Sequence, residues 1–386
     1  MTSESTLSAR ERAAQVSGGE RALVGPLKGY HHETYVFPLP DRPEGPDAPE
    51  GGGGSAAAKP TRWKCREPRK NLLWFDRRCF SSEENLVKAL AGHISRIPEV
   101  IDFGDFGLQK FIEGRTLGSR HAFGDVIPER LIGQIVELFE ELTAVDPEKL
   151  SVARRCVAKD RPADGDTAGF VERLICFTEE QVYLRNAPRF GGLFRALGID
   201  AQCFGTLRRN VSGLTSRPFG LLHGDLHREN FIVDPDGRLW AIDWELAMVG
   251  DPLYDLATHL YLMRYRPEQA EDVKRRWRAA VEMVRPGSSE GWQEDLPRLL
   301  AYKRAQSVFT DVIRAALTLD TRPGLSWWPL LHAGHKVQGV LGRAQEALGL
   351  PEVPGHWQIM DALRTWSRRD AERERRARAK RADTRV

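Results

Sequence analysis

The acidic and amide side chains best suited to chemistry gather in residues 221–257, which read LLHGDLHRENFIVDPDGRLWAIDWELAMVGDPLYDLA. Asp225 lies two residues after His223 and five before Asn230, and Asp243 ends a later apolar run. A carboxylate can accept the proton of an attacking hydroxyl, and carboxylate and amide oxygens are ligands that Mg2+ prefers. Together these residue types are the set that phosphoryl transfer from ATP requires.

A predicted hairpin explains how these side chains could meet. Two short apolar runs, 231–233 and 239–242, flank the sequence DPDG, which is typical of a tight turn between two strands. Such a turn brings the loop before the first strand next to the residue that ends the second. We therefore expect Asp225, Asn230 and Asp243 to converge.

The strings HGDLHRENF, AIDWE and GDPLYDLA resemble the signature of the aminoglycoside phosphotransferase and choline kinase group, small-molecule kinases with a protein-kinase-like fold. The resemblance follows the order of elements over nearly the whole chain, and its specific part is 221–257. It implies an α+β, bilobal protein-kinase-like fold with a small β-rich N-lobe and a large helical C-lobe. It also implies ATP and Mg2+ as cofactors, and transfer of the γ-phosphate to a hydroxyl of a small molecule.

The same resemblance implies a role for each polar residue of the segment. Asp225 would be the catalytic base, and His223 would orient the loop that carries it. Asn230 and Asp243 would be the Mg2+ ligands. Asp255, in the string GDPLYDLA, would be structural.

The same residues could also belong to other classes of protein. His223 and His227 could be zinc ligands, but no third His or Cys stands at a fitting spacing and HExxH is absent. A protein kinase is disfavoured because HGD replaces HRD and IDWE replaces DFG. The main alternative is a kinase-like module that binds a nucleotide or another ligand without turnover.

The residues before 128 predict the small lobe. Two short apolar segments in 22–39 indicate a hairpin, and the alternation in 61–69 indicates a strand with Trp63 and Cys65 on its buried face. A short helix follows Ser82, and 99–117 predicts two further strands. The Gly- and Pro-rich stretch 41–60 is expected to be a mobile insertion.

The resemblance implies a nucleotide site in this lobe. A loop at 29–34 would cover the phosphates, and a basic residue on the third strand would pair with a glutamate on the helix. KCREP favours Arg66 over Lys64 as that cation, and Glu83 is its candidate partner. The hinge that holds adenine through backbone groups would be 109–112. The candidate nucleotide-binding residues are thus Gly29, His32, Lys64, Arg66, Glu83, Gln109 and Ile112.

Residues from 128 onward are predominantly helical in pattern and would choose the acceptor. Acidic side chains could offset the charge of a cationic amino sugar, and tryptophans could stack on a sugar or cover an ammonium group. Aminoglycosides, choline-like alcohols, homoserine, methylthioribose and nucleoside antibiotics all remain open as acceptors. The candidate acceptor-binding residues are Glu245, Asp251, Asp255, Glu268, Glu271, Asp272, Trp327, Trp328 and Trp357.

Composition limits the class of protein. The chain has 386 residues, of which 41% are hydrophobic and 29% are charged, so it can bury the cores of two lobes. Its apolar runs are far shorter than the roughly 18 residues that span a bilayer, and its N-terminus lacks the apolar stretch of a secretory signal. We therefore expect a cytoplasmic protein without a membrane partner. Five cysteines without CxxC indicate reduced thiols.

The expected organisation is a tail at 1–20 that is disordered or forms a loose helix, a nucleotide-binding N-lobe at 21–110, a C-lobe at 111–366 and a basic tail at 367–386. That last segment carries nine basic and four acidic residues, in a chain of net charge +3. Acidic residues interrupt it and no aromatic residue follows Trp366. A solvated helix extension is therefore favoured over a nucleic-acid-binding arm. The oligomeric state stays open.

Overall fold

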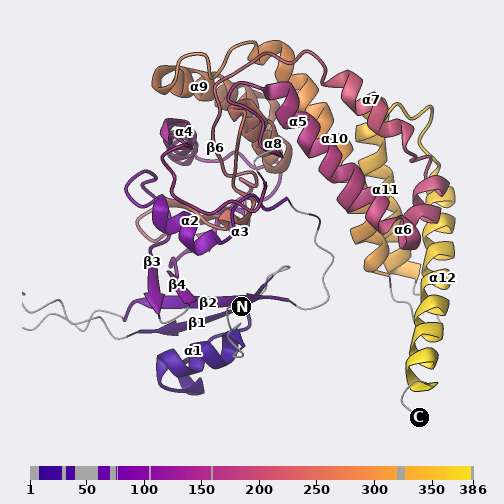
Figure 1. Ribbon diagram of the computed structural model, residues 1–386, viewed down its shortest axis with the longest axis horizontal. Helices are drawn as coiled ribbons and strands as arrows, with labels where there is room; N and C mark the ends of the chain where they lie inside the picture. The colour runs from indigo at the N-terminus through magenta and orange to yellow at the C-terminus, as the bar shows by residue number, and fades with distance from the viewer. Residues whose placement is uncertain are drawn as a thin grey trace, which may run out of the picture.

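The protein is described by a computed structural model (Figure 1). It covers residues 8–27, 32–39, 60–69, 75, 77–103, 106–157, 160–319 and 327–383. Gly29, and nearly all of the predicted insertion at 41–60, lie outside the described residues.

The small lobe is built on a four-stranded antiparallel sheet with the strand order β1-β2-β4-β3. Helix α1 lies on one side of this sheet and α2 on the other (Figure 1). The elements are α1 (Ala9–Ser17), the short helix η1 (Glu20–Ala22), β1 (His32–Pro38), β2 (Arg62–Pro68), α2 (Glu83–Ala89), β3 (Val100–Phe103) and β4 (Phe106–Lys110).

Strand β2 alternates as the sequence predicts. Trp63 and Cys65 are buried in a small apolar cluster that includes Leu108 of β4 and residues of α1. Successive side chains of a strand point to opposite faces, so Lys64 and Arg66 face the other way, toward the cavity between the lobes.

Residues 9–17 form a helix in the segment for which the sequence predicts disorder or a loose helix. Ser8 and Glu11 form a reciprocal capping box at its start. Ala9 and Ala13, one turn apart, are fully buried against the sheet. Two alanines make too short a stripe to register as an apolar period, yet they allow close packing of the helix on β1 and β2.

The large lobe is mainly helical. Its longest helices, α10, α11 and α12, lie side by side (Figure 1), and α10 and α11 make an extensive contact. The helical elements are α3 (Leu117–Arg120), α4 (Glu129–Ala144), α5 (Thr167–Phe177), the π-helical stretch η3 (Thr178–Leu184), α6 (Arg185–Ala196), α7 (Gln202–Asn210), η4 (Trp244–Leu246), α8 (Pro252–Met263), α9 (Pro267–Val284), α10 (Trp292–Leu317), α11 (Trp327–Leu348) and α12 (His356–Asp383).

Two small antiparallel sheets interrupt the helices and hold the predicted hairpin. Strands β7 and β8 pair with Phe231 opposite Ala241, and the turn between them contains Gly237 at a positive φ of 79°. This conformation favours glycine. The strands are β5 (Arg115–Thr116), β6 (Gly220–Leu222), β7 (Phe231–Val233), β8 (Leu239–Ala241) and β9 (Met248–Gly250), in the orders β5-β7-β8 and β6-β9.

Helix α12 continues without a break across residue 367, where the sequence analysis places the start of the basic tail. Ser367 and Asp370 are buried, and both carboxylate oxygens of Asp370 accept hydrogen bonds from Arg189 of α6. The first turn of the expected tail therefore packs on the large lobe. Asp370, one of the acidic residues that interrupt the basic run, is thus the buried partner of Arg189.

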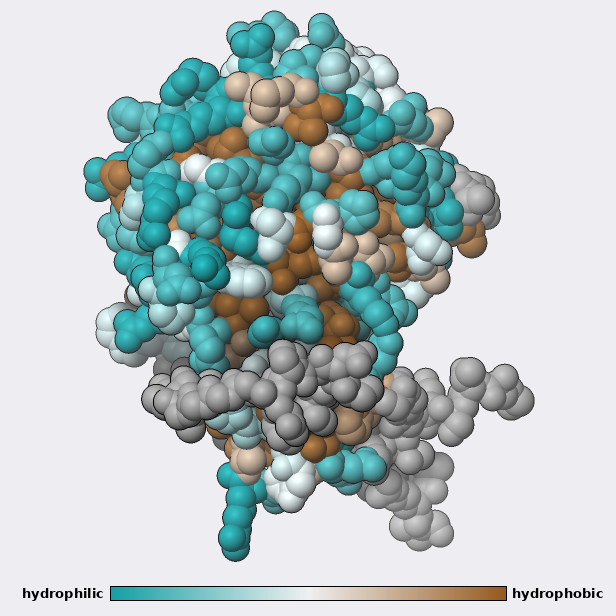
Figure 2. All heavy atoms as spheres, turned by 90° about the vertical axis from the view of Figure 1, so that its left-hand side faces the viewer, coloured by the Kyte–Doolittle hydropathy of each residue, from teal (hydrophilic) through white to brown (hydrophobic). Residues whose placement is uncertain are grey.

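These elements confirm the predicted α+β, bilobal architecture, with a small sheet-based lobe and a large helical one. No helix in the described part of the chain is long and apolar enough to cross a lipid bilayer. The face of the molecule shown in Figure 2 is mostly hydrophilic, with hydrophobic side chains visible between the polar ones.

Candidate active site

Asp255 of helix α8 fixes the loop that carries Asp225 through hydrogen bonds to the loop backbone. The two carboxylate oxygens of Asp255 accept hydrogen bonds from the backbone N–H groups of His223, at 2.9 Å, and Gly224, at 2.8 Å. Gly224 has a φ of 79°, and a Cβ there would lie 2.7 Å from the carbonyl oxygen of Leu246. Only glycine fits this position without strain, so Gly224 permits the close approach of the loop to Leu246.

Asp225 and Asn230 are joined directly. Nδ2 of Asn230 donates to the backbone oxygen of Asp225 at 2.9 Å and to its Oδ2 at 3.1 Å. Because the amide nitrogen is used in this way, the amide oxygen of Asn230 remains available as a ligand.

The hairpin brings Asp243 to the same place. Ile242 N–H donates to the backbone oxygen of Asn230 at 3.0 Å, so the residue that follows Ile242 lies beside the loop. Asp243 itself is left-handed, with φ 66° and ψ 68°, a conformation that is uncommon outside glycine and frequent at functional sites. Asp225, Asn230 and Asp243 all line one cavity of about 1030 Å³, as the hairpin predicts.

His223 lies behind the loop, fully buried, and does not line this cavity. Its Nε2 is 3.2 Å from the backbone oxygen of Ile242. Burial lowers the pKa of His223 to about 4, so the ring is neutral and donates from Nε2 to that oxygen. Because a buried ring does not reach the cavity, His223 does not act on substrate directly, which agrees with the orienting role that the resemblance implied. It is a positioning residue that ties the loop to the hairpin.

His227 is a cavity residue that the sequence analysis considered only as a zinc ligand. Its Nδ1 accepts the N–H of Glu229 at 3.1 Å, so Nε2 carries the proton, and Nε2 lies 3.4 Å from Oδ2 of Asp225. Burial lowers the pKa of His227, but the hydrogen bond and charge of Asp225 outweigh burial and raise the pKa above its usual value. The HGDLH string contains the signal for this contact, since His227 follows Asp225 by two residues.

Arg66, and not Lys64, makes the ion pair with helix α2. Nη2 of Arg66 pairs with Glu83, and its Nε donates to Oε1 of Glu84 at 3.3 Å. Lys64 lies on the same face and lines the cavity. Burial and the charge of Arg66 lower the pKa of Lys64 to about 8. The guanidinium with its several donors can serve two carboxylates at once.

Glu83 also connects the two lobes. Its Oε1 accepts the backbone N–H of Trp244, the residue after Asp243, at 3.1 Å. Helix α2 of the small lobe is thereby tied to the end of the hairpin in the large lobe.

Three carboxylates form a candidate cation site among the described residues. Glu83, Asp243 and Glu245 each have a ligand atom within 4.8 Å of the others. Glu83 already pairs with Arg66, and Glu245 accepts from Arg78 at 2.6 Å. Oδ1 of Asp243 is buried and has no hydrogen-bond donor in the described part of the chain. Asp243 is therefore the member of this group that is best able to bind a metal ion, and its hard oxygen suits Mg2+.

The remaining nucleotide candidates fall into two groups. His32 and Ile112 line the main cavity, and His32 Nδ1 lies 3.6 Å from Glu245. Gln109 faces a different cavity of about 440 Å³ between the sheet and α2. Gln109 does not line the main cavity, and its backbone is paired with Lys64 in the sheet. The segment that borders the main cavity starts at Lys110.

Four of the acceptor candidates are excluded by their positions. Asp251 is fully buried in an ion pair with Arg217, which is also fully buried. Asp255 is buried under the catalytic loop, which agrees with the structural role that the resemblance implied. Trp327 and Trp328 are 52% and 75% exposed, and neither lines the cavity.

Glu245 does line the cavity, but at the end that borders the small lobe, where its carboxylate pairs with Arg78. Trp357 is also outside the cavity, with its ring 5.8 Å from that of Trp327. These tryptophans start helices α11 and α12 at the far side of the large lobe, which their spacing in the sequence could not reveal.

The cavity residues of α8 and α10 were missed by the sequence analysis. Tyr254 and Tyr261 come from α8, and Lys303 and Arg314 come from α10. The only signal was the amphipathic pattern of these helices, which marks a buried face but does not separate a cavity wall from a core.

The sequence and the fold were compared with known proteins. A profile of the phosphotransferase enzyme family matches residues 62–292. No curated protein matches the chain. A choline/ethanolamine kinase family protein from Mesorhizobium loti shares the fold, with a TM-score of 0.51, 16% identity, and coverage of 92% of this chain and 98% of that one.

Two further solved structures are similar at lower TM-scores. Choline kinase LicA from Streptococcus pneumoniae has a TM-score of 0.49 and 15% identity, over 87% of this chain and 96% of that one. A thermostable mutant of aminoglycoside phosphotransferase APH(4)-Ia, in a ternary complex with ADP and hygromycin B, has a TM-score of 0.47 and 13% identity, over 90% and 100%. With more than half of its length matched by the family profile, this chain belongs to the phosphotransferase enzyme family and is a kinase that acts on a hydroxyl group.

Proposed function

We propose that the protein transfers the γ-phosphoryl group of ATP to a hydroxyl of a small molecule, with Asp225 as the catalytic base. The observation that carries this proposal is the convergence of Asp225, Asn230 and Asp243 on one cavity between the lobes. The cavity is bordered on the small-lobe side by Arg66 and Lys64.

Asp225 would accept the proton of the acceptor hydroxyl as that oxygen attacks the γ-phosphorus. The hydrogen bond from Asn230 fixes one carboxylate oxygen, and the contact with His227 orients the same oxygen. Positioning of this kind supplies much of the rate enhancement in phosphoryl transfer, because there is little covalent chemistry for the protein to perform.

Asp243 and the amide oxygen of Asn230 would hold Mg2+. When bound, the ion would neutralise charge on the phosphate groups. Glu83 and Glu245 border this site, but each is already compensated by an arginine. We therefore propose that Glu83 and Glu245 hold these arginines in place beside the site and are not ligands of the metal ion.

The small lobe would hold the nucleotide. Arg66 and Lys64 supply positive charge to the phosphates, with Arg66 oriented by Glu83. The backbone N–H of Ile112 has no partner among the described residues and borders the cavity. It is our candidate donor to adenine, in place of Gln109.

The test is release of ADP from Mg-ATP in the presence of a pooled panel of hydroxylated compounds. The panel contains aminoglycosides, amino alcohols, sugars, sugar acids and nucleosides. We expect stimulation by at least one pool, lost in Asp225→Asn and kept in Asp236→Asn. Asp236 lies in the exposed hairpin turn, with a side chain that is 71% exposed, so it is a matched control. Equal ADP release by wild type and Asp225→Asn would contradict the assignment of the base.

A further inference from the structure

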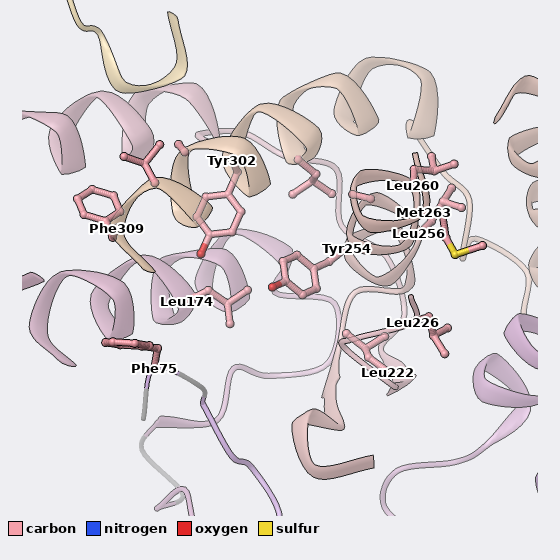
Figure 3. Packing of buried hydrophobic residues seen from close by; sticks show 14 of the residues in the cluster. Phe75, Leu174, Leu222, Leu226, Tyr254, Leu256, Leu260, Met263, Tyr302 and Phe309 are labelled. Atoms are coloured by element: carbon pink, nitrogen blue, oxygen red, sulfur yellow. The ribbon is translucent and has the colours of Figure 1, made fainter. Parts of the chain in front are cut away.

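The cavity continues beyond Asp225 into the large lobe, where the acceptor must lie if ATP occupies the lobe interface. This end is walled by helices α5, α8 and α10, the stretch η3, and Phe75. Figure 3 shows Phe75, Leu174 and Tyr254 from separate elements facing a common region below Tyr302. The walls are thus partly aromatic and apolar, which lowers the local dielectric and strengthens any charge interaction there.

The described side chains of α10 and of the segment around Phe75 that line this end and carry a charge are cationic. Lys303 and Arg314 of α10 line it, together with Arg77. Among the described lining residues of α5, η3, α8 and α10, none is Asp or Glu. The other polar groups are neutral hydroxyls and an amide, from Thr178, Thr258, Tyr261, Gln306, Ser307 and Thr310.

Lys303 is the central cation of this end. Its Nζ donates to the hydroxyl of Tyr254 at 3.1 Å and to Oε1 of Gln306 at 2.9 Å, and it lies 5.0 Å from the centre of the Tyr254 ring. It makes no ion pair with a carboxylate in the described part of the chain. Burial raises the pKa of the nearby Asp255, and the positive charge of Lys303 is among the interactions that lower it. Both oxygens of Asp255 accept hydrogen bonds from the loop that carries Asp225.

The carboxylates of the cavity lie elsewhere. Asp243 and Glu245 are at the nucleotide end, beside Arg66 and Arg78. Glu229 is exposed at the mouth, close to Gly118 of α3. A polycationic acceptor would therefore meet the cation of Lys303, and no described lining residue of these helices supplies a carboxylate to offset the acceptor's own charge. Bringing like charges together without compensation is costly.

We infer that the acceptor is a hydroxylated small molecule that carries an oxyanion, a carboxylate or a phosphate, bound at Lys303 with Arg314 and Arg77 nearby. The inference rests on the proposed function, since it takes Asp225 as the place of the reacting hydroxyl. In the transfer step the bond between the γ-phosphorus and its bridging oxygen to ADP breaks, a bond from the acceptor oxygen to that phosphorus forms, and the hydroxyl proton passes to Asp225. ADP leaves with the electron pair of the broken bond.

The test uses two sets of probes, each built on one hydroxylated scaffold that carries an anionic, a neutral or a cationic group. One set is glycerate, glycerol phosphate, glycerol and aminopropanediol, and the other is the para isomers of hydroxymethylbenzoate, hydroxymethylbenzamide and hydroxymethylbenzylamine. Binding of each to the full chain is measured by thermal shift and calorimetry with Mg2+ and a non-hydrolysable ATP analogue. We expect the anionic members to bind about 10- to 100-fold more tightly than the neutral ones, as for hydrogen bonds to charged groups, and the cationic members to bind most weakly. The carboxylate and phosphate arms decide between the two oxyanions.

Three variants control the result. Lys303→Gln should abolish the preference for anions, and Lys303→Arg should retain most of it. Lys336→Gln removes the same charge from the surface of α11, where Lys336 is 48% exposed and pairs with Asp311, and should keep the preference. The melting temperature of each variant without probe reports whether it folds.

The outcomes separate this inference from the proposed function. Absence of binding by every anionic probe, equal binding within each set, or preference for the cationic members would overturn the anion site. If a cationic compound is nevertheless phosphorylated in an Asp225-dependent manner, the phosphotransferase proposal stands and the anion site falls. If anions bind with Lys303-dependent preference and no probe stimulates Asp225-dependent ADP release, the anion site stands and the assignment of Asp225 falls.

Discussion

Nη1 of Arg66, on strand β2 of the small lobe, lies 3.9 Å from Oδ1 of Asp243, at the end of the hairpin in the large lobe. The same guanidinium pairs with Glu83, whose other oxygen accepts the N–H of Trp244. Arg66 and Glu83 therefore link the two lobes through polar contacts on one side of the cavity.

This relationship predicts the effect of replacing Arg66. Arg66→Met should raise the KM for Mg-ATP about 10- to 100-fold, because it removes charged hydrogen bonds and leaves Glu83 without its cation. Arg66→Lys should recover only part of the loss, since an ammonium cannot serve Glu83 and Glu84 with the same fork of donors. Steady-state kinetics with varied Mg-ATP measure the effect. Lys88→Met, at an exposed pair on α2, is the control, and equal KM values for the two Met variants would contradict the role of Arg66.

Asp243→Asn should weaken the binding of Mg-ATP more than the binding of ATP without metal. The amide keeps the shape of the side chain and one oxygen, but loses the charge that favours a divalent cation. Calorimetric titration with ATP, at several Mg2+ concentrations, measures this difference. An unchanged dependence of affinity on Mg2+ would remove Asp243 from the proposed metal site. Addition of EDTA should abolish ADP release by the wild-type protein.

His259 should make stability depend on pH. It is fully buried, with Nδ1 2.9 Å from the backbone oxygen of Leu226 and Nε2 2.8 Å from the hydroxyl of Tyr265. Burial lowers the pKa of His259 to about 4, whereas the unfolded chain has an ordinary histidine pKa near 6.5. Between these values the unfolded state binds more protons, so the free energy of unfolding falls as the pH decreases from about 6.5 to about 4.

Urea denaturation of wild type and His259→Gln across this range tests that expectation. The variant should show a smaller loss of stability on acidification, whatever its stability at neutral pH. Asp255 titrates in the opposite sense, because burial raises its pKa to about 6, but it is common to both proteins and cancels in the comparison. Parallel pH profiles for the two proteins would contradict the assignment of the shift to His259.

Cys156 should be the fastest cysteine to react with iodoacetamide among those with described surroundings. A hydrogen bond from Cys79 and the nearby Arg161 lower the pKa of the Cys156 thiol to about 5, and the thiolate is the nucleophile. Its alkylation rate should be nearly constant from pH 8 to pH 6 and fall below about pH 5. Cys176 is the internal control, because burial and Glu172 raise its pKa. Peptide mass spectrometry measures both rates, and faster alkylation of Cys176 at neutral pH would contradict the prediction.

Much of the fold could be predicted from local patterns. The alternation in β2, the hairpin turn before β8 and the helical periods from residue 128 onward all involve neighbours in sequence, and local backbone preferences decide such features. The sequence left open whether residues 9–17 are disordered or helical, and it could not show that this helix packs on the sheet, because the packing depends on two alanines and on strands distant in the chain. The position of Gln109 outside the main cavity could not be predicted, because the exact register of β4 decides which residue leaves the sheet first.

The convergence of Asp225, Asn230 and Asp243 could be predicted from the sequence alone, since one loop and one tight hairpin separate them. The three-dimensional packing established which cation pairs with Glu83, and it showed that Asp251, Trp327 and Trp328 lie away from the cavity. The same packing places Lys303 and Arg314 in one wall of the cavity. Those contacts join residues that are far apart in the chain, and their positions follow from how whole helices pack, which no local spacing records.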